Sequence, residues 1–401
     1  MNRKLYRLSG LVLLFFFAGC VPQQTGWDGV SKRNLPPDQP YAPPYDCITA
    51  QNPGKFSLST AEIQEGAKKR DVILLTKVAV AMASGALKGK TDKDALTGFE
   101  AAAGVGNAFS QYEAGFRYYT GKTVKQDYRK GVQYFEMAAK QNYCMAQYML
   151  ADAYLKGNGV AKDIPTAIKY LDASARQGHF QGLHDMGHRL SSGDGVRADP
   201  RMSTAYFRSA SILGYAPSMY AYGAHLMRGI GVSADVTEGA KWQLKAADLG
   251  ESSGQFETGL NYIEGKGLPK DAQKGFKYLN SSANKGNHLA QYFLWSVFKE
   301  NKDKETRDTV WGYLDSAARQ GFPPAMLGKA ATMAKEKKRT SKQNIEAYKW
   351  AMLSIMRGFK KVLNEEQKAE ALAVADELEK RLSKADQEKA KKIIEAWKPG
   401  S

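Results

Sequence analysis

Two histidines four residues apart are the clearest candidates for metal chemistry in the chain. His184 and His188 would lie one turn apart on the same side of a helix, where both rings could bind one zinc ion. Asp185 follows the first histidine, at the position where a helical zinc-protease motif carries its general-base glutamate. A zinc site needs at least a third protein ligand, and this motif supplies two. We therefore predict no metal site here, and interpret both histidines as packing residues.

A serine followed three residues later by a lysine is the second candidate for catalysis. Ser282 and Lys285 match the S-x-x-K element of serine penicillin-binding enzymes, but the S-D-N and K-T-G elements do not accompany them. An activated serine also needs an exposed oxygen beside a base. The Gly-Lys-Thr sequences at Gly89 and Gly121 lack an upstream glycine at phosphate-loop spacing. The sequence predicts no catalytic residue and no cofactor.

The elements that hold these residues recur every 36 residues. Four kinds of residue keep this step. A Gly-x-Gly turn begins at Gly157, Gly193, Gly229 and Gly265, and an aspartate stands at Asp127, Asp163, Asp199, Asp235 and Asp271. An aromatic residue stands at Tyr134, Tyr170, Tyr206, Trp242 and Tyr278, and a last glycine at Gly178, Gly214, Gly250 and Gly286. Glycine can take a positive φ and end a helix, and aspartate can cap the next one. Each repeat is therefore predicted to be a helix A, a glycine-rich turn, a helix B and a glycine turn.

The repeats resemble the Sel-one-like repeat family, a branch of the tetratricopeptide-like solenoids. The resemblance is closest in ADAYLKGNGVAKDIPTAIKYLDASARQGH and GLNYIEGKGLPKDAQKGFKYLNSSANKGN. It implies an all-α fold, a right-handed α/α superhelix (solenoid) of about eight helix-turn-helix repeats with a C-terminal helical cap. In this register His184 falls in a column of aromatic residues and Ser282 in a column of small residues, as expected for packing positions.

The amino terminus predicts export and a lipid anchor. A basic start and an apolar core of eight residues, Leu11–Ala18, are followed by Gly19 and Cys20. The core is too short to span a bilayer. The sequence Phe-Ala-Gly-Cys resembles the lipobox of bacterial lipoproteins, which implies cleavage before Cys20 and lipid attachment to it. Val21 rather than aspartate follows, and this resemblance points to the outer membrane, with the protein facing the periplasm.

These patterns divide the chain into six segments. They are residues 1–19, a lipoprotein signal peptide; 20–58, the lipidated cysteine and a proline-rich linker; 59–107, a degenerate N-terminal repeat; 108–322, the Sel-one-like repeat array; 323–358, a degenerate C-terminal repeat; and 359–401, a charged helical cap. Seven of the 14 prolines lie between Pro22 and Pro53, so the linker is predicted to be an extended spacer.

Composition narrows the function classes. Three cysteines and five histidines exclude a disulfide-dense scaffold or a zinc array, and a mean hydropathy of −0.49 excludes a multispan membrane protein. The formal charge is +17, which favours acidic partners. Nine basic and two acidic residues lie within 331–361, either as a solvated face or as a patch for anionic polymer, lipid headgroups or an acidic protein. Few aromatic residues accompany them, so nucleic acid is not an expected partner.

Two cysteines remain besides Cys20. Cys47 and Cys144 could form a disulfide that joins the linker to the first full repeats, or they could be two free thiols. Some secreted Sel-one-like proteins carry a cysteine pair in every repeat and are described as β-lactamases. This chain departs from that pattern, which weakens transfer of that activity.

Two columns of helix A are least explained by packing and are predicted to bind a partner. They contain Glu113, Asp185 and Glu257, and, four residues later, Arg117, Arg189, His225 and Asn261. The resemblance places helix A on the concave surface of the array. The function predicted is a lipid-anchored cell-envelope scaffold that binds a protein, or an anionic polysaccharide or peptidoglycan, on this surface. The alternatives are a periplasmic enzyme acting on peptidoglycan or β-lactams and a periplasmic metal-binding protein.

Overall fold

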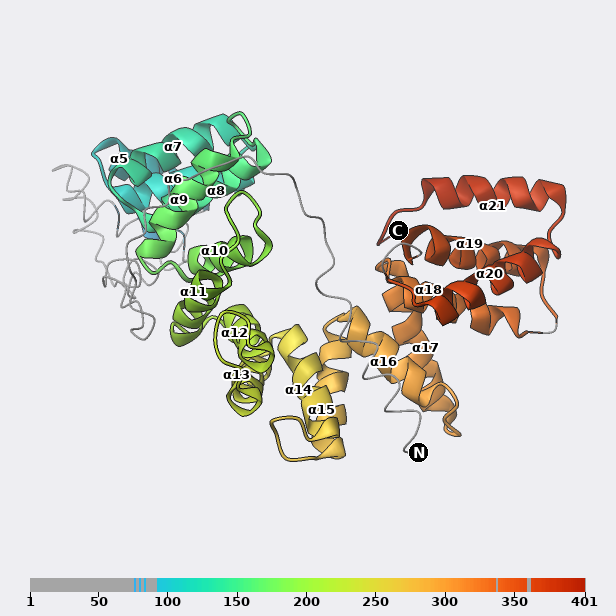
Figure 1. Ribbon diagram of the computed structural model, residues 1–401. Coiled ribbons are helices and arrows are strands. Elements are labelled where there is room, and N and C mark those ends of the chain that lie inside the picture. The colour runs from blue at the N-terminus through green and yellow to red at the C-terminus, as the bar shows by residue number, and fades with distance from the viewer. Residues whose placement is uncertain are drawn as a thin grey trace. The chain divides into compact units, whose positions relative to one another are not determined.

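The computed structural model describes residues 76, 79–80, 83, 92–336, 338–358 and 362–400. All regular secondary structure within these ranges is helical, which confirms the predicted all-α fold (Figure 1). The described helices fall into two compact units that divide after Asp235. We call them the N-terminal unit and the C-terminal unit. No helix in the described ranges is both long enough and apolar enough to cross a bilayer.

The N-terminal unit contains eight described helices that pack in the order of the chain. They are α5 (Asp92–Gly104), α6 (Ala108–Thr120), α7 (Tyr128–Lys140), α8 (Cys144–Lys156), α9 (Ile164–Arg176), α10 (Phe180–Ser192), α11 (Pro200–Ile212) and α12 (Ala216–Arg228). Each helix packs chiefly against the helices before and after it. This is the stacking of helix pairs that a solenoid requires, because one pair alone cannot bury its apolar face.

Helix ends follow the predicted columns of aspartate and glycine. Asp163 has an extended backbone, and its carboxylate accepts a hydrogen bond from the Thr166 amide at 3.2 Å. The same cap is formed at Asp127, Asp199 and Asp271. Gly193 ends α10 in the left-handed conformation, with φ of 75°, and its amide bonds to the Arg189 carbonyl. The predicted helix starts at Asp127, Asp163, Asp199 and Asp271 and the predicted helix end at Gly193 are therefore confirmed.

The core of the N-terminal unit repeats with the same period as the caps. Phe99, Phe135, Leu171 and Phe207 are spaced 36 residues apart on the B helices, and all four are buried. The A helix of each pair keeps a small residue where it meets this column. A Cβ atom added to Gly187 of α10, for example, would lie 2.8 Å from the Phe207 ring. Close approach of the two helices thus depends on one small and one large residue per repeat.

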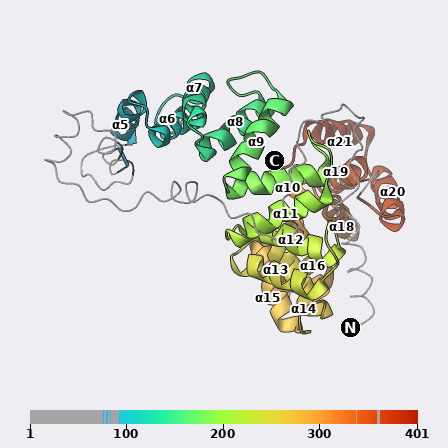
Figure 2. The same ribbon diagram turned by 60° about the vertical axis from the view of Figure 1, so that its left-hand side comes forward.

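The C-terminal unit continues the helix pairs and adds two closing helices. They are α13 (Val236–Asp248), α14 (Ser252–Glu264), α15 (Ala272–Asn284), α16 (His288–Phe298), α17 (Lys304–Arg319), α18 (Pro323–Ala334), α19 (Ser341–Gly358), α20 (Glu365–Glu379) and α21 (Lys384–Ala396). Figure 2 shows α20 and α21 beside α18 and α19; α20 packs on both α18 and α19, and α21 packs on α19. Asn364 caps α20 in a capping box and Ser383 caps α21.

Candidate functional site

Three hydrogen bonds join successive A helices of the N-terminal unit. The Tyr119 hydroxyl of α6 donates to Asp152 of α8 at 3.0 Å, and the Tyr148 hydroxyl of α8 donates to Asp185 of α10 at 3.0 Å. His184 of α10 continues the series, since its Nδ1 lies 2.8 Å from the Ser218 Oγ of α12. We call the surface formed by the half-buried members of this series, Asp152, Tyr148, Asp185 and His184, together with the exposed His188 beside His184, the A-helix face. Because the bonds connect one repeat to the next, they hold this surface as one unit.

Four residues of the predicted binding columns are half-buried, and two of them lie on α10. Asp185 is half-buried; burial raises the pKa of its carboxyl, and the hydrogen bond from Tyr148 acts in the opposite direction. Arg189 lies one turn further along α10 and pairs with Asp194 at 2.8 Å. Glu113 of α6 is half-buried, and Glu257 of α14 is half-buried in the C-terminal unit. These side chains remain open to part of the solvent.

Three other residues of the predicted columns are buried, so the expectation of a partner-binding role does not hold for them. Arg117, His225 and Asn261 are 3%, 5% and 3% exposed. Each contacts the B helix of the preceding repeat. Arg117 lies 4.5 Å from the centroid of the Phe99 ring, the His225 Nδ1 lies 2.7 Å from the Thr204 Oγ1, and the Asn261 amide donates to Gln243 at 2.8 Å. At these three positions the column faces inward because the A helix lies on that B helix, whereas Arg189 of the same column is half-buried.

The histidines and the serine of the chemical motifs also have packing roles. The rings of His184 and His188 lie 4.5 Å apart and both contact Phe207. Within the described ranges, no group of three or more His, Cys, Asp or Glu side chains could hold a metal ion. Ser282 is fully buried and its hydroxyl donates to the Ser252 carbonyl at 2.7 Å. The Lys285 Nζ donates to the Gly250 carbonyl, so neither group is placed to form a nucleophile and its base.

The remaining motif residues are only partly within the described ranges. Gly121 is the C-cap of α6 with φ of 74°, which makes its Gly-Lys-Thr sequence a helix-end turn. Gly89, Cys20 and Cys47 lie outside the described residues. Cys144 is buried at the start of α8 and takes part in a disulfide, so it is not a free thiol. Pairing of Cys144 with Cys47 stays a prediction.

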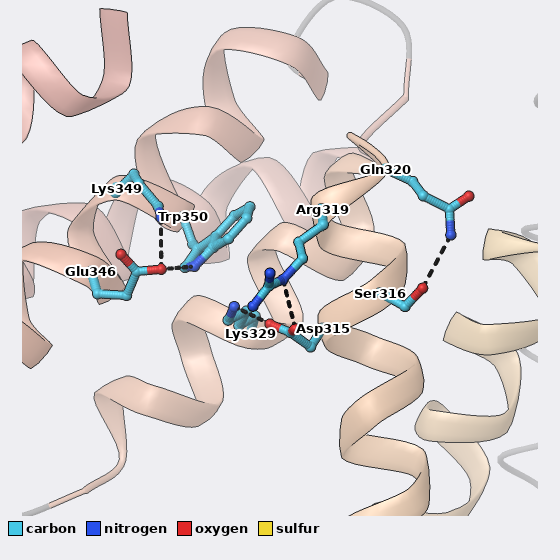
Figure 3. Close-up of polar contacts among 8 residues, drawn as sticks. All are labelled: Asp315, Ser316, Arg319, Gln320, Lys329, Glu346, Lys349 and Trp350. Atoms are coloured by element: carbon cyan, nitrogen blue, oxygen red, sulfur yellow. Dashed lines mark hydrogen bonds and ion pairs between the residues drawn. The ribbon is translucent and has the colours of Figure 1, made fainter. Parts of the chain in front are cut away.

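A charged cluster in the C-terminal unit was not predicted. Figure 3 shows Trp350 of α19 with Lys329 of α18 and Lys349 of α19 near it. Both lysine Nζ atoms lie 4.3 Å from the centroid of the indole ring. Lys329 pairs with Asp315 of α17, and Lys349 pairs with Glu346 at 2.6 Å. The two lysines are buried, so each carboxylate compensates a charge that has left water.

This cluster changes the interpretation of the basic stretch at 331–361. The residues Lys335, Lys338, Lys342 and Arg357 of this stretch are exposed, as expected for a solvated face. Lys349 is buried instead. Lys329 lies just before the stretch, at the helix A position that carries Leu150 and Met186 in other repeats. A lysine in a column of apolar residues is the sequence signal that could have revealed the cluster.

Two buried histidines predict a dependence of stability on pH. Burial lowers the pKa of His179 and of His225 to about 4. Because both are neutral in the folded state and have a pKa near 6.5 when unfolded, the unfolded state binds more protons between these values. Stability should therefore fall as the pH drops below 6.5, by about 2 kcal/mol for each histidine at pH 5.

Urea unfolding at pH 7.5 and pH 5 measures this loss, and one variant isolates the part due to His179. The Nδ1 of His179 caps α10 by accepting from the Gly182 amide at 3.1 Å. Asn107 and Asn287 form the equivalent caps in other repeats. His179→Asn should keep the cap and reduce the pH-dependent loss by about 2 kcal/mol. An unchanged pH dependence in this variant would contradict the assignment.

Comparison with known proteins places the repeats in a family. The Sel1 repeat family model matches five segments, residues 108–143, 144–179, 181–215, 216–251 and 252–287. These five segments contain helices α6 to α15. No curated protein matches the chain in sequence.

Two solved structures share the fold. One is a protective antigen present in uropathogenic Escherichia coli strains that displays an SLR fold; it is 24% identical, with a TM-score of 0.61, over 84% of this chain and 75% of that one. The other is a Sel1 repeat protein from Oxalobacter formigenes, 24% identical, with a TM-score of 0.54, over 60% of this chain and 96% of that one. Identities this low establish the fold alone. Residues 108–287 therefore carry five Sel1 repeats, and the chain shares the fold of Sel1 repeat proteins of known structure.

Proposed function

We propose that the protein is a lipid-anchored scaffold of the cell envelope, which binds a partner protein on the A-helix face of its repeats. Sel1 repeat proteins generally mediate interactions between proteins. The repeat scaffold is generally not catalytic, and the motif residues Ser282 and His184 have packing partners. The anchor and the export signal rest on the amino-terminal sequence up to Cys20, which lies outside the described residues.

The observation that carries the proposal is the contrast between two kinds of repeat position. The buried core column of the B helices stays large and apolar from Phe99 to Phe207. The column of half-buried or exposed residues at the end of each A helix changes its chemistry instead. This column contains Thr120, Lys156, Ser192, Arg228 and Glu264. A core column that stays apolar over four repeats, beside an exposed column that changes from basic to acidic, is typical of a repeat protein that recognises a specific partner.

The anchor is tested by fractionating cells that express the full chain. Wild-type protein should be recovered with membranes, and Cys20→Ala should abolish both cleavage before residue 20 and lipid attachment. The variant should therefore lose incorporation of radiolabelled palmitate, because no thiol remains at the acceptor position. Cys47→Ala is the matched control and should keep full incorporation. Equal labelling of the two variants would contradict the proposed anchor.

A further inference from the structure

An open groove lies between two successive repeats of the N-terminal unit, residues 108–143 and 144–179. It has a volume of about 720 Å³ and is lined by the end of α6, the α6–α7 turn, the start of α7 and Gly159 of the next turn. Tyr118 and Tyr128 are among its lining residues. The groove is therefore formed by two successive repeats and is not a feature of one helix pair.

The charge of this groove is positive and poorly compensated. Lys125 and Arg129 are exposed lining residues, and neither has an ion-pair or hydrogen-bond partner through its side chain in the part of the chain that the structure describes. Lys130 differs, because it binds Glu100 at 3.0 Å and the Tyr118 hydroxyl at 2.6 Å. The one lining carboxylate, Asp127, accepts a hydrogen bond from the Lys130 amide as the cap of α7.

The same edge carries further cations in the next two repeats. Arg197 and Arg201 lie 72 residues after Lys125 and Arg129, at the equivalent positions of the turn and the B helix. Lys162 lies between them along the chain. All are exposed, and none has a side-chain partner among the described residues. We call these five residues the basic turn edge.

The carboxylates on this edge already have hydrogen-bond or ion-pair partners within the chain. Asp163 and Asp199 cap α9 and α11, where each accepts a hydrogen bond from a backbone amide. Asp194 pairs with Arg189 at 2.8 Å. The basic turn edge thus presents cations over three successive repeats whose charge the neighbouring carboxylates balance only in part.

We propose that the basic turn edge binds an extended acidic segment of the partner protein. An acidic chain is complementary in charge to cations repeated over three helix pairs, and the groove can receive side chains beside Tyr118 and Tyr128. A flat anionic bilayer fits a recessed groove less well than a flexible peptide does. This inference rests on the proposed function, because it names the chemistry of the same partner and a second surface that contacts it.

The test measures binding of a fluorescent 12-residue peptide of alternating Glu and Ser by the mature full-length chain. Lys125→Glu/Arg129→Glu should weaken binding at least about tenfold, because it reverses two cations of the edge. Lys140→Glu/Lys169→Glu makes the same change of charge at exposed B-helix positions away from the edge, and should change binding less than about twofold. Circular dichroism must show equal melting temperatures for both variants. Lys125→Ala/Arg129→Ala removes the same two cations without reversing their charge, and should also weaken peptide binding.

Equal weakening by the edge variant and its control would overturn the inference, because the peptide would then respond to net charge alone. No detectable binding of the wild-type chain would also overturn it. Edge-dependent binding to phosphatidylglycerol vesicles, without binding to the peptide, would assign the edge to a membrane instead. Crosslinking of a partner through the A-helix face is independent of these results. If that crosslink forms and the edge variants leave it unchanged, the edge inference fails and the proposed function stands.

Discussion

Gly231→Ala should destabilise the N-terminal unit by about 3–4 kcal/mol in urea unfolding. Gly231 lies in the turn after α12 with φ of 70°, and a Cβ atom added there would lie 2.1 Å from the carbonyl oxygen of Pro200. Pro200 is the first residue of α11, the B helix of the preceding repeat. The turn of one repeat therefore rests on the backbone of the repeat before it, and backbone cannot move aside as a flexible side chain can.

Gly214→Ala is the matched control for this prediction. Gly214 has φ of 88°, and a Cβ atom added there meets nothing within 4 Å. Its replacement should cost only the left-handed backbone strain, about 1–2 kcal/mol. Thr123 occupies the position of Gly231 in the repeat at 108–143 and has φ of 70°. A residue other than glycine can therefore tolerate this backbone strain by itself. Equal losses for the two glycines would contradict the proposed contact between repeats.

Asp315→Ala should destabilise the C-terminal unit by about 3 kcal/mol. The mutation leaves the ammonium of Lys329 buried beside Trp350 without its carboxylate partner (Figure 3). Arg319 also pairs with Asp315, at 2.8 Å, but it is largely exposed and can be solvated after the change. Most of the loss should therefore come from the buried lysine.

A second substitution separates the buried charge from the lost packing. Lys329→Met fills the same space without a charge, and should change the free energy of unfolding by less than about 1 kcal/mol. Adding it to Asp315→Ala should recover most of the stability, which a double-mutant cycle measures in urea. If the double variant is as unstable as Asp315→Ala alone, the loss comes from side-chain packing and this account of the ion pair is wrong.

The sequence predicts the helix ends well because their physics is local. An aspartate cap such as Asp163 needs only the amide three residues later, and a helix-ending glycine such as Gly193 needs only its own positive φ. Repetition at 36 residues then turns each weak local signal into a strong one. The glycine turns, the B-helix starts and the two closing helices follow from this reasoning.

The candidate surface is predicted only in part because helix packing decides which side of a column is covered. Asp185 and Arg117 stand in columns four residues apart on helix A, and the sequence pattern assigns both to one surface. The structure buries Arg117 against Phe99 of the preceding B helix and leaves Asp185 half-buried. The rotation of an A helix on that B helix is set by contacts 18 residues or more away, as in Asn261 with Gln243.

The buried charges of the C-terminal unit were missed for a related reason. Lysines near 331–361 are ordinarily solvated, and the prediction treats the stretch as one surface. Lys349 can be buried because it forms an ion pair with Glu346, three residues earlier on α19. The Trp350 indole donates a hydrogen bond to the same carboxylate. Lys329 depends on Asp315, which lies on another helix. A partner from another helix leaves no local pattern in the sequence.

Site-specific photo-crosslinking in the native envelope tests the central claim most directly. A photoreactive amino acid replaces His188, an exposed residue of α10 on the A-helix face, in the full-length chain. The control replaces Lys169, an exposed residue of α9. Recognition through the A-helix face predicts a discrete crosslink to one protein at position 188 and none at position 169. Absence of a discrete product at 188, or the same products at both positions, would contradict it.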